Sequence, residues 1–265
     1  MSFQLTRGRV PLLVSIPHMG TEIPADLQGG YVQRALAVED ADWHLDRLYG
    51  FVKELGASVL QPRYARYVID LNRPPDNAPM YPGASNTELC PTRFFDGEPL
   101  YAGQAPEAAE QERRRATYWQ PYHEALAAEL ARLKQEHGYA LLWDAHSIRS
   151  EIPWLFEGVL PDLNIGTNAG ASAAPAITEA VAVAAASDAR YTRAVNGRFK
   201  GGYITRHYGN PRQHVHAVQL EMTQKSYMRE APPYDYLEER AAQVQPVLRA
   251  MVEAALQATQ ALYGR

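Results

Sequence analysis

Two histidines each follow a short apolar run of the chain, a placement typical of metal and catalytic sites. His18 comes just after the run that ends at Ile16 and stands beside Gly20. Open α/β sheets bind their ligands at the carboxyl ends of strands. His146 closes a second apolar run, and the period-two geometry of an extended chain puts Asp144 on the same side. Asp144 could orient His146 through its other ring nitrogen or bind a metal itself.

Carboxylates stand where they could reach the same edge of the sheet. The acidic block 39–46 opens a predicted helix, where carboxylates also serve as caps. Asp42 and Asp46 lie one turn apart, so either could face His18, and the spacing does not choose between them. Glu221 closes a late apolar run, where a carboxylate is costly unless it is paired or catalytic. Two histidines and a carboxylate match hydrolytic zinc, with Glu221 free to act as a general base.

The segment 63–73 contains a short apolar run and three arginines, which are Arg63, Arg66 and Arg73. Guanidinium groups bind carboxylates through two parallel hydrogen bonds. Arg66 and Asp70 could pair with each other as a structural unit. Arg73 precedes two prolines at the end of the run and is better placed to hold an acidic substrate.

The elements that must position these residues are read from apolar periodicity. Short runs rich in β-branched residues predict buried strands at 10–16, 57–61, 66–71, 139–144 and 215–221. Helical patterns cover 43–55, 107–137, 173–186 and 236–263, with Pro121 and Pro246 as expected kinks or helix starts. The alternation predicts an α/β, three-layer sandwich with a mixed, largely parallel central sheet.

Two segments show little periodicity and are rich in Gly, Pro, Asn and aromatic residues. They are 73–104 and 196–213, and we predict that both are long loops. Loops of this length in a compact domain are usually lids or binding loops. We therefore expect substrate recognition there.

Composition excludes several classes of protein. The chain has 265 residues, of which 46% are hydrophobic and 21% charged, so we expect one soluble domain over 1–265. The formal charge of −4, with no run of like charges, gives no surface for nucleic acid or an anionic membrane. No apolar run could span a bilayer, and no signal peptide is evident. The single Cys90 fits a reducing compartment, so we predict a cytoplasmic protein with a small-molecule substrate.

Seven strings, taken together and in this order, resemble the N-formylglutamate amidohydrolase family over residues 10–230. The strings are SIPHMG, DADWHLDRLY, RYVIDLNRP, DAHS, LPDLNIGTN, NGRFKGGYITRHYGNP and HAVQLEM. The resemblance implies a fold similar to zinc-dependent exopeptidases and hydrolysis of N-formyl-L-glutamate to formate and L-glutamate, in histidine degradation. It also implies Zn²⁺, or another divalent metal, bound by His18, Asp42 and His146, with Glu22 as the substitute acidic ligand.

The same resemblance implies roles for the remaining polar residues. Glu221 would take a proton from the attacking water and return it to the leaving amine. The substrate carries two carboxylates, so cationic or amide groups must hold them. The candidates are Arg66, Asn72, Arg73, Arg149, Thr205 and Arg206.

Two other functions are weighed against this one. A zinc carboxypeptidase or a deacylase of another N-acyl amino acid would need a larger pocket, whereas crowding by Tyr81, Trp154 or Tyr203 would favour the small formyl group. A metal-free binding protein for acidic amino acids would use the same arginines, but it would leave Glu221 and the two histidines without a role. The sequence does not indicate an oligomeric state.

Overall fold

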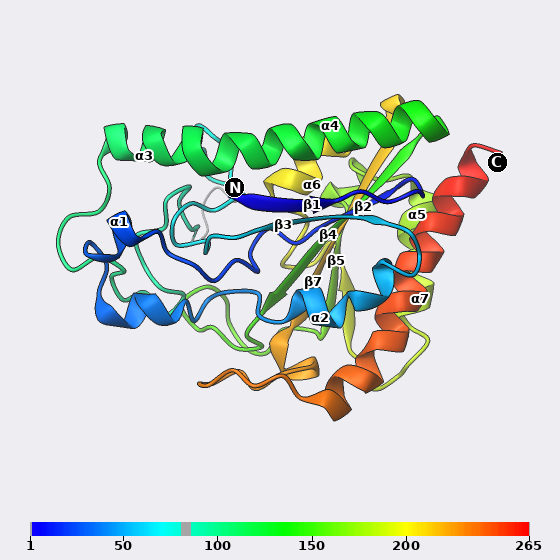
Figure 1. Cartoon of the computed structure of the whole chain (residues 1–265). Helices are drawn as coiled ribbons and strands as arrows, with labels where there is room; N and C mark the ends of the chain where they lie inside the picture. The colour runs from blue at the N-terminus through cyan, green and yellow to red at the C-terminus, as the bar shows by residue number, and fades with distance from the viewer. Residues whose placement is uncertain (1, 81–85, 265) are drawn as a thin grey trace.

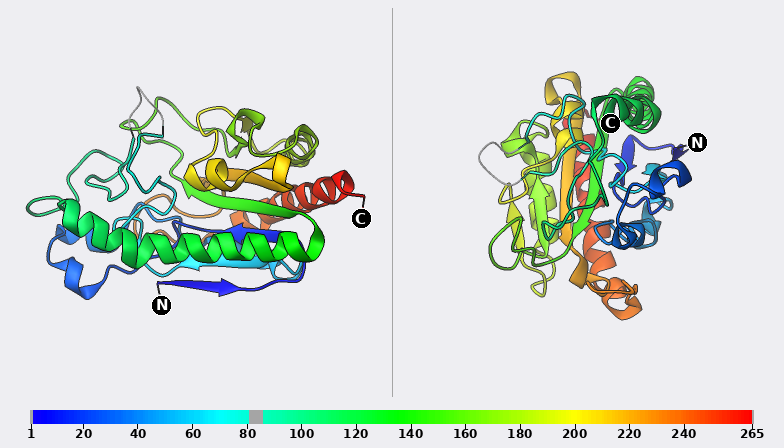
Figure 2. Two further views of the ribbon diagram at one scale, coloured as in Figure 1. Left: turned by 90° about the horizontal axis from the view of Figure 1, so that it is seen from above. Right: turned by 90° about the vertical axis from the view of Figure 1, so that its left-hand side faces the viewer.

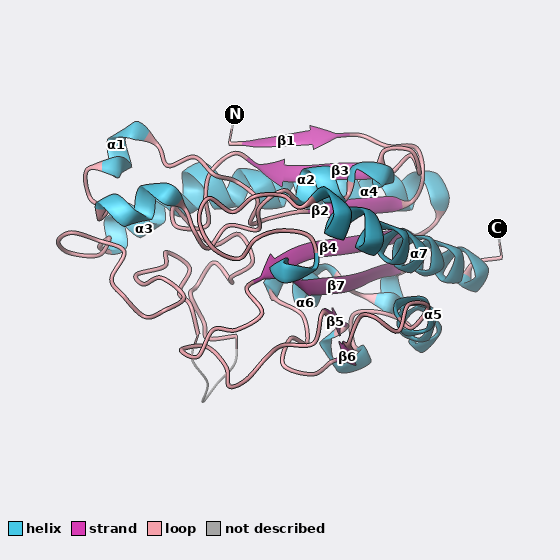
Figure 3. Ribbon diagram, turned by 90° about the horizontal axis from the view of Figure 1, so that it is seen from below, coloured by secondary structure: helices cyan, strands magenta, loops and turns pink. Residues whose placement is uncertain are grey.

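A central mixed sheet organises the chain in the computed structural model, which describes residues 2–80 and 86–264. Within these residues the seven strands lie in the order β1-β3-β2-β4-β7-β5-β6 (Figure 3). The strands are β1 (Phe3–Thr6), β2 (Leu12–Ser15), β3 (Ser58–Pro62), β4 (Ala140–Ile148), β5 (Leu163–Gly166), β6 (Arg193–Val195) and β7 (Val215–Thr223). The central strands β3, β2, β4 and β7 run parallel. Strand β1 runs antiparallel to β3, and β5 runs antiparallel to β7.

Helices cover both faces of this sheet. They are α1 (Ala25–Gln28), α2 (Leu45–Leu48), α3 (Ala108–Arg114), α4 (Gln120–His137), α5 (Pro175–Ala185), α6 (Tyr203–Tyr208) and α7 (Glu238–Leu262). Leu12 and Val14 of β2 pack into a core with α2, α5 and α7, whereas Leu13 packs into a second core with α4 and α6. Figure 1 shows α4 along one side of the sheet and α2 on the other. The predicted α/β sandwich is therefore confirmed.

Four of the five strands predicted from the sequence are present in the structure. The runs at 10–16, 57–61, 139–144 and 215–221 correspond to β2, β3, β4 and β7. The predicted strand at 66–71 is wrong, because the chain there forms a turn and irregular backbone. The sequence analysis missed β1, β5 and β6, which have three or four residues each and therefore too little alternation to detect.

The helix predictions at 173–186 and 236–263 are confirmed by α5 and α7, and Pro246 lies inside α7. The predicted helix at 43–55 is largely wrong. Only α2 and a 3₁₀ turn at Gly50–Val52 form there. The aromatic and β-branched residues and Gly50 in this segment are weak helix formers, so an apolar stripe does not produce a long helix.

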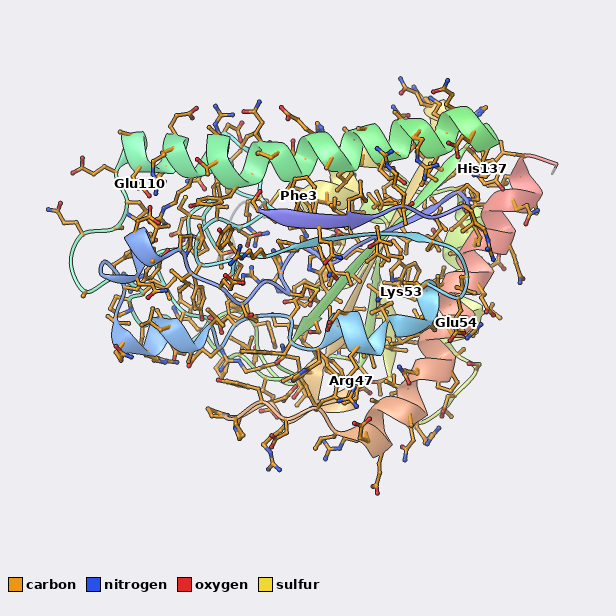
Figure 4. All side chains as sticks on the ribbon, viewed as in Figure 1. Phe3, Arg47, Lys53, Glu54, Glu110 and His137 are labelled. Atoms are coloured by element: carbon orange, nitrogen blue, oxygen red, sulfur yellow. The ribbon has the colours of Figure 1, made fainter. Side chains whose placement is uncertain are left out.

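The predicted helix at 107–137 forms a long rod, visible in the left view of Figure 2. Helices α3 and α4 join through a π-helical turn at Arg115–Trp119. Figure 4 labels Glu110 near one end of the rod and His137 near the other. Pro121 lies at the start of α4, where the widened turn relieves the clash that its ring would make with the Thr117 carbonyl in a regular helix.

The two predicted loops differ in outcome. The described part of 73–104 has no helix or regular strand. The prediction for 196–213 is wrong in part, because α6 and a 3₁₀ turn at Pro211–Gln213 lie within it. No helix among the described residues is both long and apolar enough to cross a membrane.

Candidate metal centre and active site

Three candidate ligands come together from separate segments of the chain. His18 follows β2, Asp42 precedes α2 and His146 lies in β4. The His18 and His146 Nδ1 atoms are 3.2 Å apart, and Asp42 Oδ2 lies 3.3 Å from His146 Nδ1 and 3.8 Å from His18 Nδ1. All three side chains are buried, and their potential ligand atoms lie within 4.8 Å of one another. The structure thus brings together His18, Asp42 and His146.

The far sides of both imidazole rings face carboxylates. His18 Nε2 lies 2.7 Å from Asp70 Oδ1, and His146 Nε2 lies 3.1 Å from Asp144 Oδ1. Since metal-binding histidines normally donate their second ring N–H to a carboxylate or carbonyl, we assign the ring protons to Nε2. Asp144 therefore lies where it can orient His146. Asp70 does the same for His18, a role that the sequence analysis missed when it paired Asp70 with Arg66 alone.

This assignment makes the centre fit a divalent cation. Both Nδ1 atoms then present lone pairs to each other and to Asp42 Oδ2, so three acceptors converge on one point. Arg66 Nη1 lies 3.3 Å from His18 Nδ1. Asp42 Oδ2 also accepts a hydrogen bond from the Ser147 N–H at 3.1 Å, whereas Asp42 Oδ1 is buried and has no hydrogen-bond partner among the described residues. Such a set of nitrogen and oxygen donors suits Zn²⁺.

The other two acidic candidates lie elsewhere. Glu22 is half exposed and pairs with Arg63 at 2.8 Å. Asp46 lies in α2 and lines a separate hollow with Tyr49 and Lys53. Asp42 is therefore the acidic candidate that lies beside the histidines, a choice that helical spacing could not make.

Burial and neighbouring charges shift the pKa values at the centre in different directions. Burial lowers the pKa of His18, and the Arg66 charge adds to this. Burial opposes ionisation of Asp70, but His18 and Arg66 hold its pKa well below the usual range. Burial also opposes protonation of His146, yet Asp144 raises the pKa of His146 well above its ordinary value.

Glu221 stands next to this centre. The parallel ladder of β4 and β7 pairs its Cα with that of His146, and its side chain lines the same pocket as both histidines. Burial raises the pKa of Glu221 to about 8, although the His146 and Arg66 charges partly oppose this. A dication at the centre would lower that pKa again, because it favours the carboxylate form. Glu221 is thus a buried carboxyl group beside the centre, placed where it can exchange a proton with a molecule bound there.

The pocket above the centre contains half of the predicted substrate-binding residues. Arg66, Asn72 and Arg73 line it, whereas the other three do not. Thr205 donates a hydrogen bond to Asp144 Oδ2 at 3.1 Å. Arg149 donates to Asp40, and Arg206 donates to the Gly201 carbonyl, each at 2.8 Å.

Aromatic side chains line this pocket, but they are not the ones expected. Tyr81 lies outside the described residues, and Trp154 and Tyr203 are not among the lining residues. Phe95, Phe156 and Phe199 line it, and so does Arg198, which the sequence analysis did not single out. The two loop predictions located the segments that carry Phe95, Phe199 and Arg198. They could not identify the side chains, since loops have no periodicity that orients them.

The rod formed by α3 and α4 holds the irregular segment from Arg66 to Arg73. Side chains of the rod donate hydrogen bonds to three of its carbonyls. The pairs are Arg114 Nη1 with Val68 at 3.1 Å, His123 Nε2 with Leu71 at 2.9 Å and Trp119 Nε1 with Arg73 at 3.0 Å. A buried backbone without a sheet ladder must find other partners. These bonds explain how a buried segment carrying Arg66, Asp70 and Asn72 stays ordered without forming the predicted strand.

Gly202 allows the backbone before α6 to lie against Asn72. A Cβ atom at this position would be 2.3 Å from Asn72 Nδ2. Asn72 cannot easily move, because its Oδ1 accepts from the Ile204 N–H at 2.8 Å and its backbone N–H donates to Asp70 Oδ1 at 2.8 Å. We expect Gly202→Ala to lower the free energy of unfolding by about 1–3 kcal/mol in urea denaturation.

The control for this substitution is Gly29→Ala, whose added Cβ would meet no atom within 4 Å. It should change the free energy of unfolding by less than about 1 kcal/mol. Equal stability of Gly202→Ala and the wild type would show that Asn72 is not held as tightly as its contacts indicate.

Together, the fold and this centre define an α/β protein with a candidate metal site at its strand ends. Comparisons with known proteins identify the family of this chain. The family model described as N-formylglutamate amidohydrolase matches residues 10–228. The chain therefore belongs to the N-formylglutamate amidohydrolase family.

Individual relatives cover nearly the whole chain. An N-formylglutamate deformylase of Pseudomonas aeruginosa is 55% identical over 251 residues, and one of Pseudomonas putida is 50% identical, each over 94% of both chains. The crystal structure of an N-formylglutamate amidohydrolase from Ralstonia eutropha superposes with a TM-score of 0.81 at 26% identity, covering 98% of this chain and 97% of that one. A gene product of Agrobacterium tumefaciens shares the fold with a TM-score of 0.71 at 16% identity, over 96% and 93% of the two chains.

Proposed function

We propose that this chain is an enzyme that hydrolyses N-formyl-L-glutamate to formate and L-glutamate and depends on Zn²⁺ held by His18, Asp42 and His146. The observation that carries the proposal is the convergence of three ligand atoms beside Glu221 at the base of a pocket lined by arginines. The two Pseudomonas relatives bear the name of this activity. When bound, the metal would supply Lewis acidity and bring the pKa of a coordinated water toward about 7.

The residues of this chain have separable roles in that reaction. Glu221 accepts a proton from the attacking water, whose oxygen bonds to the formyl carbon. The proton then passes from the Glu221 carboxyl to the amide nitrogen as the C–N bond breaks, which releases formate and the free amine. Arg66 lies close enough to His18 to stabilise negative charge that develops on the formyl oxygen.

Binding of the substrate falls to the polar groups of the pocket. Arg73 and Asn72 stand beside the centre and can hold the α-carboxylate, which is attached next to the reacting amide. Thr205 acts through Asp144, which in turn orients His146. Direct contacts of Arg149, Thr205 and Arg206 with substrate remain predictions.

Family membership argues against the two competing functions, since the relatives are named for hydrolysis of a formylated amino acid. A place in histidine degradation, a cytoplasmic location and a single catalytic domain over 1–265 remain predictions from the sequence.

The test is a formate-release assay on N-formyl-L-glutamate with purified protein, before chelation, after chelation and after zinc is restored. Metal content is measured on the same samples. We expect release that chelation abolishes and zinc restores. Release that persists in protein stripped of metal would overturn the metal dependence, and no release from zinc-loaded protein would overturn the deformylase assignment.

A second test concerns the carboxylate behind His18. Asp70→Asn removes the negative charge 2.7 Å from His18 Nε2 and should weaken zinc binding by about 10- to 100-fold. Competition with a chromogenic chelator measures this affinity directly, without turnover. Asp26→Asn, which changes an exposed carboxylate that pairs with Arg113, is the control and should bind zinc as the wild type does. Unchanged affinity in Asp70→Asn would remove Asp70 from the support of the centre.

A further inference from the structure

Three arginines supply positive charge among the described residues that line the pocket, and Glu221 is the acidic side chain there. The arginines differ in their surroundings. Arg66 Nη2 lies 2.6 Å from Asp70 Oδ2, and its guanidinium carbon is 4.7 Å from the centre of the Phe95 ring. Because a carboxylate already pairs with Arg66 beside His18, this arginine belongs to the reacting centre. Arg66 is therefore not the arginine that we expect to bind the side-chain carboxylate of the substrate.

Arg73 lies next to the centre but bonds to neutral acceptors. Its guanidinium donates to the Thr87 carbonyl at 3.0 Å, the Thr87 hydroxyl at 2.7 Å and the Asn72 carbonyl at 2.9 Å. Its neighbour Asn72 lies 3.0 Å from His146 Nε2. The charge of Arg73 is thus held in place close to the reacting amide, where the α-carboxylate of an N-acyl amino acid must lie.

Arg198 belongs to a different part of the pocket wall. It stands between β6 and α6, and its Nη2 donates to the Leu155 carbonyl at 3.2 Å. The next residue, Phe199, meets Phe156 edge to face with ring centres 6.4 Å apart. These apolar neighbours pack on a small hydrophobic cluster that is separate from the two main cores. Arg198 is therefore held through contacts of Arg198 and Phe199 with Leu155 and Phe156, and not by the elements that carry the histidines.

The backbone that carries Arg198 is anchored on its C-terminal side. The Lys200 carbonyl accepts from the Asn168 N–H, and the Gly202 N–H donates to Gln219 Oε1, each at 2.6 Å. A charged side chain on an anchored segment loses less conformational freedom on binding than one on an unattached loop. The position of Arg198 in the pocket wall is consequently suited to recognition.

We propose that Arg198 binds the side-chain carboxylate of the substrate and thereby determines specificity for acidic over neutral N-formyl amino acids. The inference rests on the proposed deformylase function and deepens it. In N-formylglutamate the side-chain carboxylate is two bonds further from the amide than the α-carboxylate. With Arg66 at the reacting centre and Arg73 beside it, Arg198 is the remaining arginine among the described lining residues.

The test compares two substrates that differ in one charge, N-formyl-L-glutamate and N-formyl-L-glutamine. In zinc-loaded Arg198→Met, kcat/KM for the glutamate compound should fall by about 10- to 100-fold, while kcat/KM for the glutamine compound stays within about twofold of wild type. The control is Arg193→Met, which removes the same charge from an exposed position on β6. It should leave both values unchanged. If Arg198→Met fails to fold, Arg198→Gln, which retains a donor for the Leu155 carbonyl, provides the same comparison.

An equal loss on both substrates, or no loss on either, would overturn the role of Arg198. Calorimetric binding of L-glutamate and L-glutamine separates this result from a failure of the proposed function. If the wild type releases no formate, the deformylase proposal fails. The Arg198 proposal then stands only if Arg198→Met selectively weakens L-glutamate binding, and it falls if binding of the two amino acids changes alike.

Discussion

Replacement of His146 by alanine should abolish both zinc binding and formate release. His146 Nδ1 lies 3.2 Å from His18 Nδ1 and 3.3 Å from Asp42 Oδ2, so its removal takes away one of three convergent ligand atoms. Two remaining protein ligands are fewer than the three that a catalytic zinc site has. Because the metal is expected to contribute several kcal/mol to the transition state, kcat/KM should fall by about 10³-fold or more. Metal analysis and the formate assay on the same sample measure both effects.

His214→Ala is the matched control, since His214 is an exposed histidine at the start of β7. It should retain the zinc content and the rate of the wild type. A His146→Ala protein that keeps stoichiometric zinc and a normal rate would exclude His146 as a ligand, and the metal would then have to be sought elsewhere.

Replacement of Glu221 by glutamine should separate metal binding from chemistry. The amide fills the same space but cannot accept the proton of the attacking water, so kcat should fall by about 10²-fold or more. Zinc content should remain that of the wild type, because Glu221 is not among the three convergent ligands. Steady-state kinetics and metal analysis provide the two measurements.

Glu179→Gln, an exposed change on α5, controls for the loss of one carboxylate and should change neither kcat nor zinc content. Loss of zinc in Glu221→Gln would instead make Glu221 a ligand. A near-normal rate with zinc retained would assign the proton transfer to a different carboxylate.

The parts of the fold that carry the site were predictable because they are buried on both faces. Strands β2, β4 and β7 appear in the sequence as short segments rich in apolar residues, and these segments place His18, His146 and Glu221 at or near strand ends. The segment at 66–71 is similarly apolar but forms no strand. Its Val68 and Leu71 carbonyls accept from side chains of α3 and α4, and its Tyr67 carbonyl accepts from the Tyr31 hydroxyl. An apolar composition indicates that a segment is buried. It does not indicate whether the backbone of that segment forms hydrogen bonds with a neighbouring strand or with side chains.

The candidate site was predictable at its centre and less so around it. Asp42 and Asp46 share a helical face in the sequence pattern, but the chain at His44 adopts a left-handed conformation, and α2 begins only after it. Asp42 therefore lies outside any helix, and helical spacing gave no basis for choosing it. The role of Asp70 behind His18 depends on a contact between residues 52 positions apart, which no local pattern contains.

The π-turn at Arg115–Trp119 makes the length of the long rod matter as much as its composition. In a regular α-helix, each step of four residues turns a side chain about 40° around the axis, so successive residues at this spacing drift off one face. The wider turn absorbs part of that drift and lets Arg114 and His123 both reach carbonyls of one buried segment. A π-turn holds one residue more than an α-turn, so deleting one residue there would leave a regular helix, whereas a deletion elsewhere in the rod would rotate one end by about 100° against the other. Homologues should therefore tolerate substitutions on the outer face of the rod, but single-residue changes in its length only at this turn.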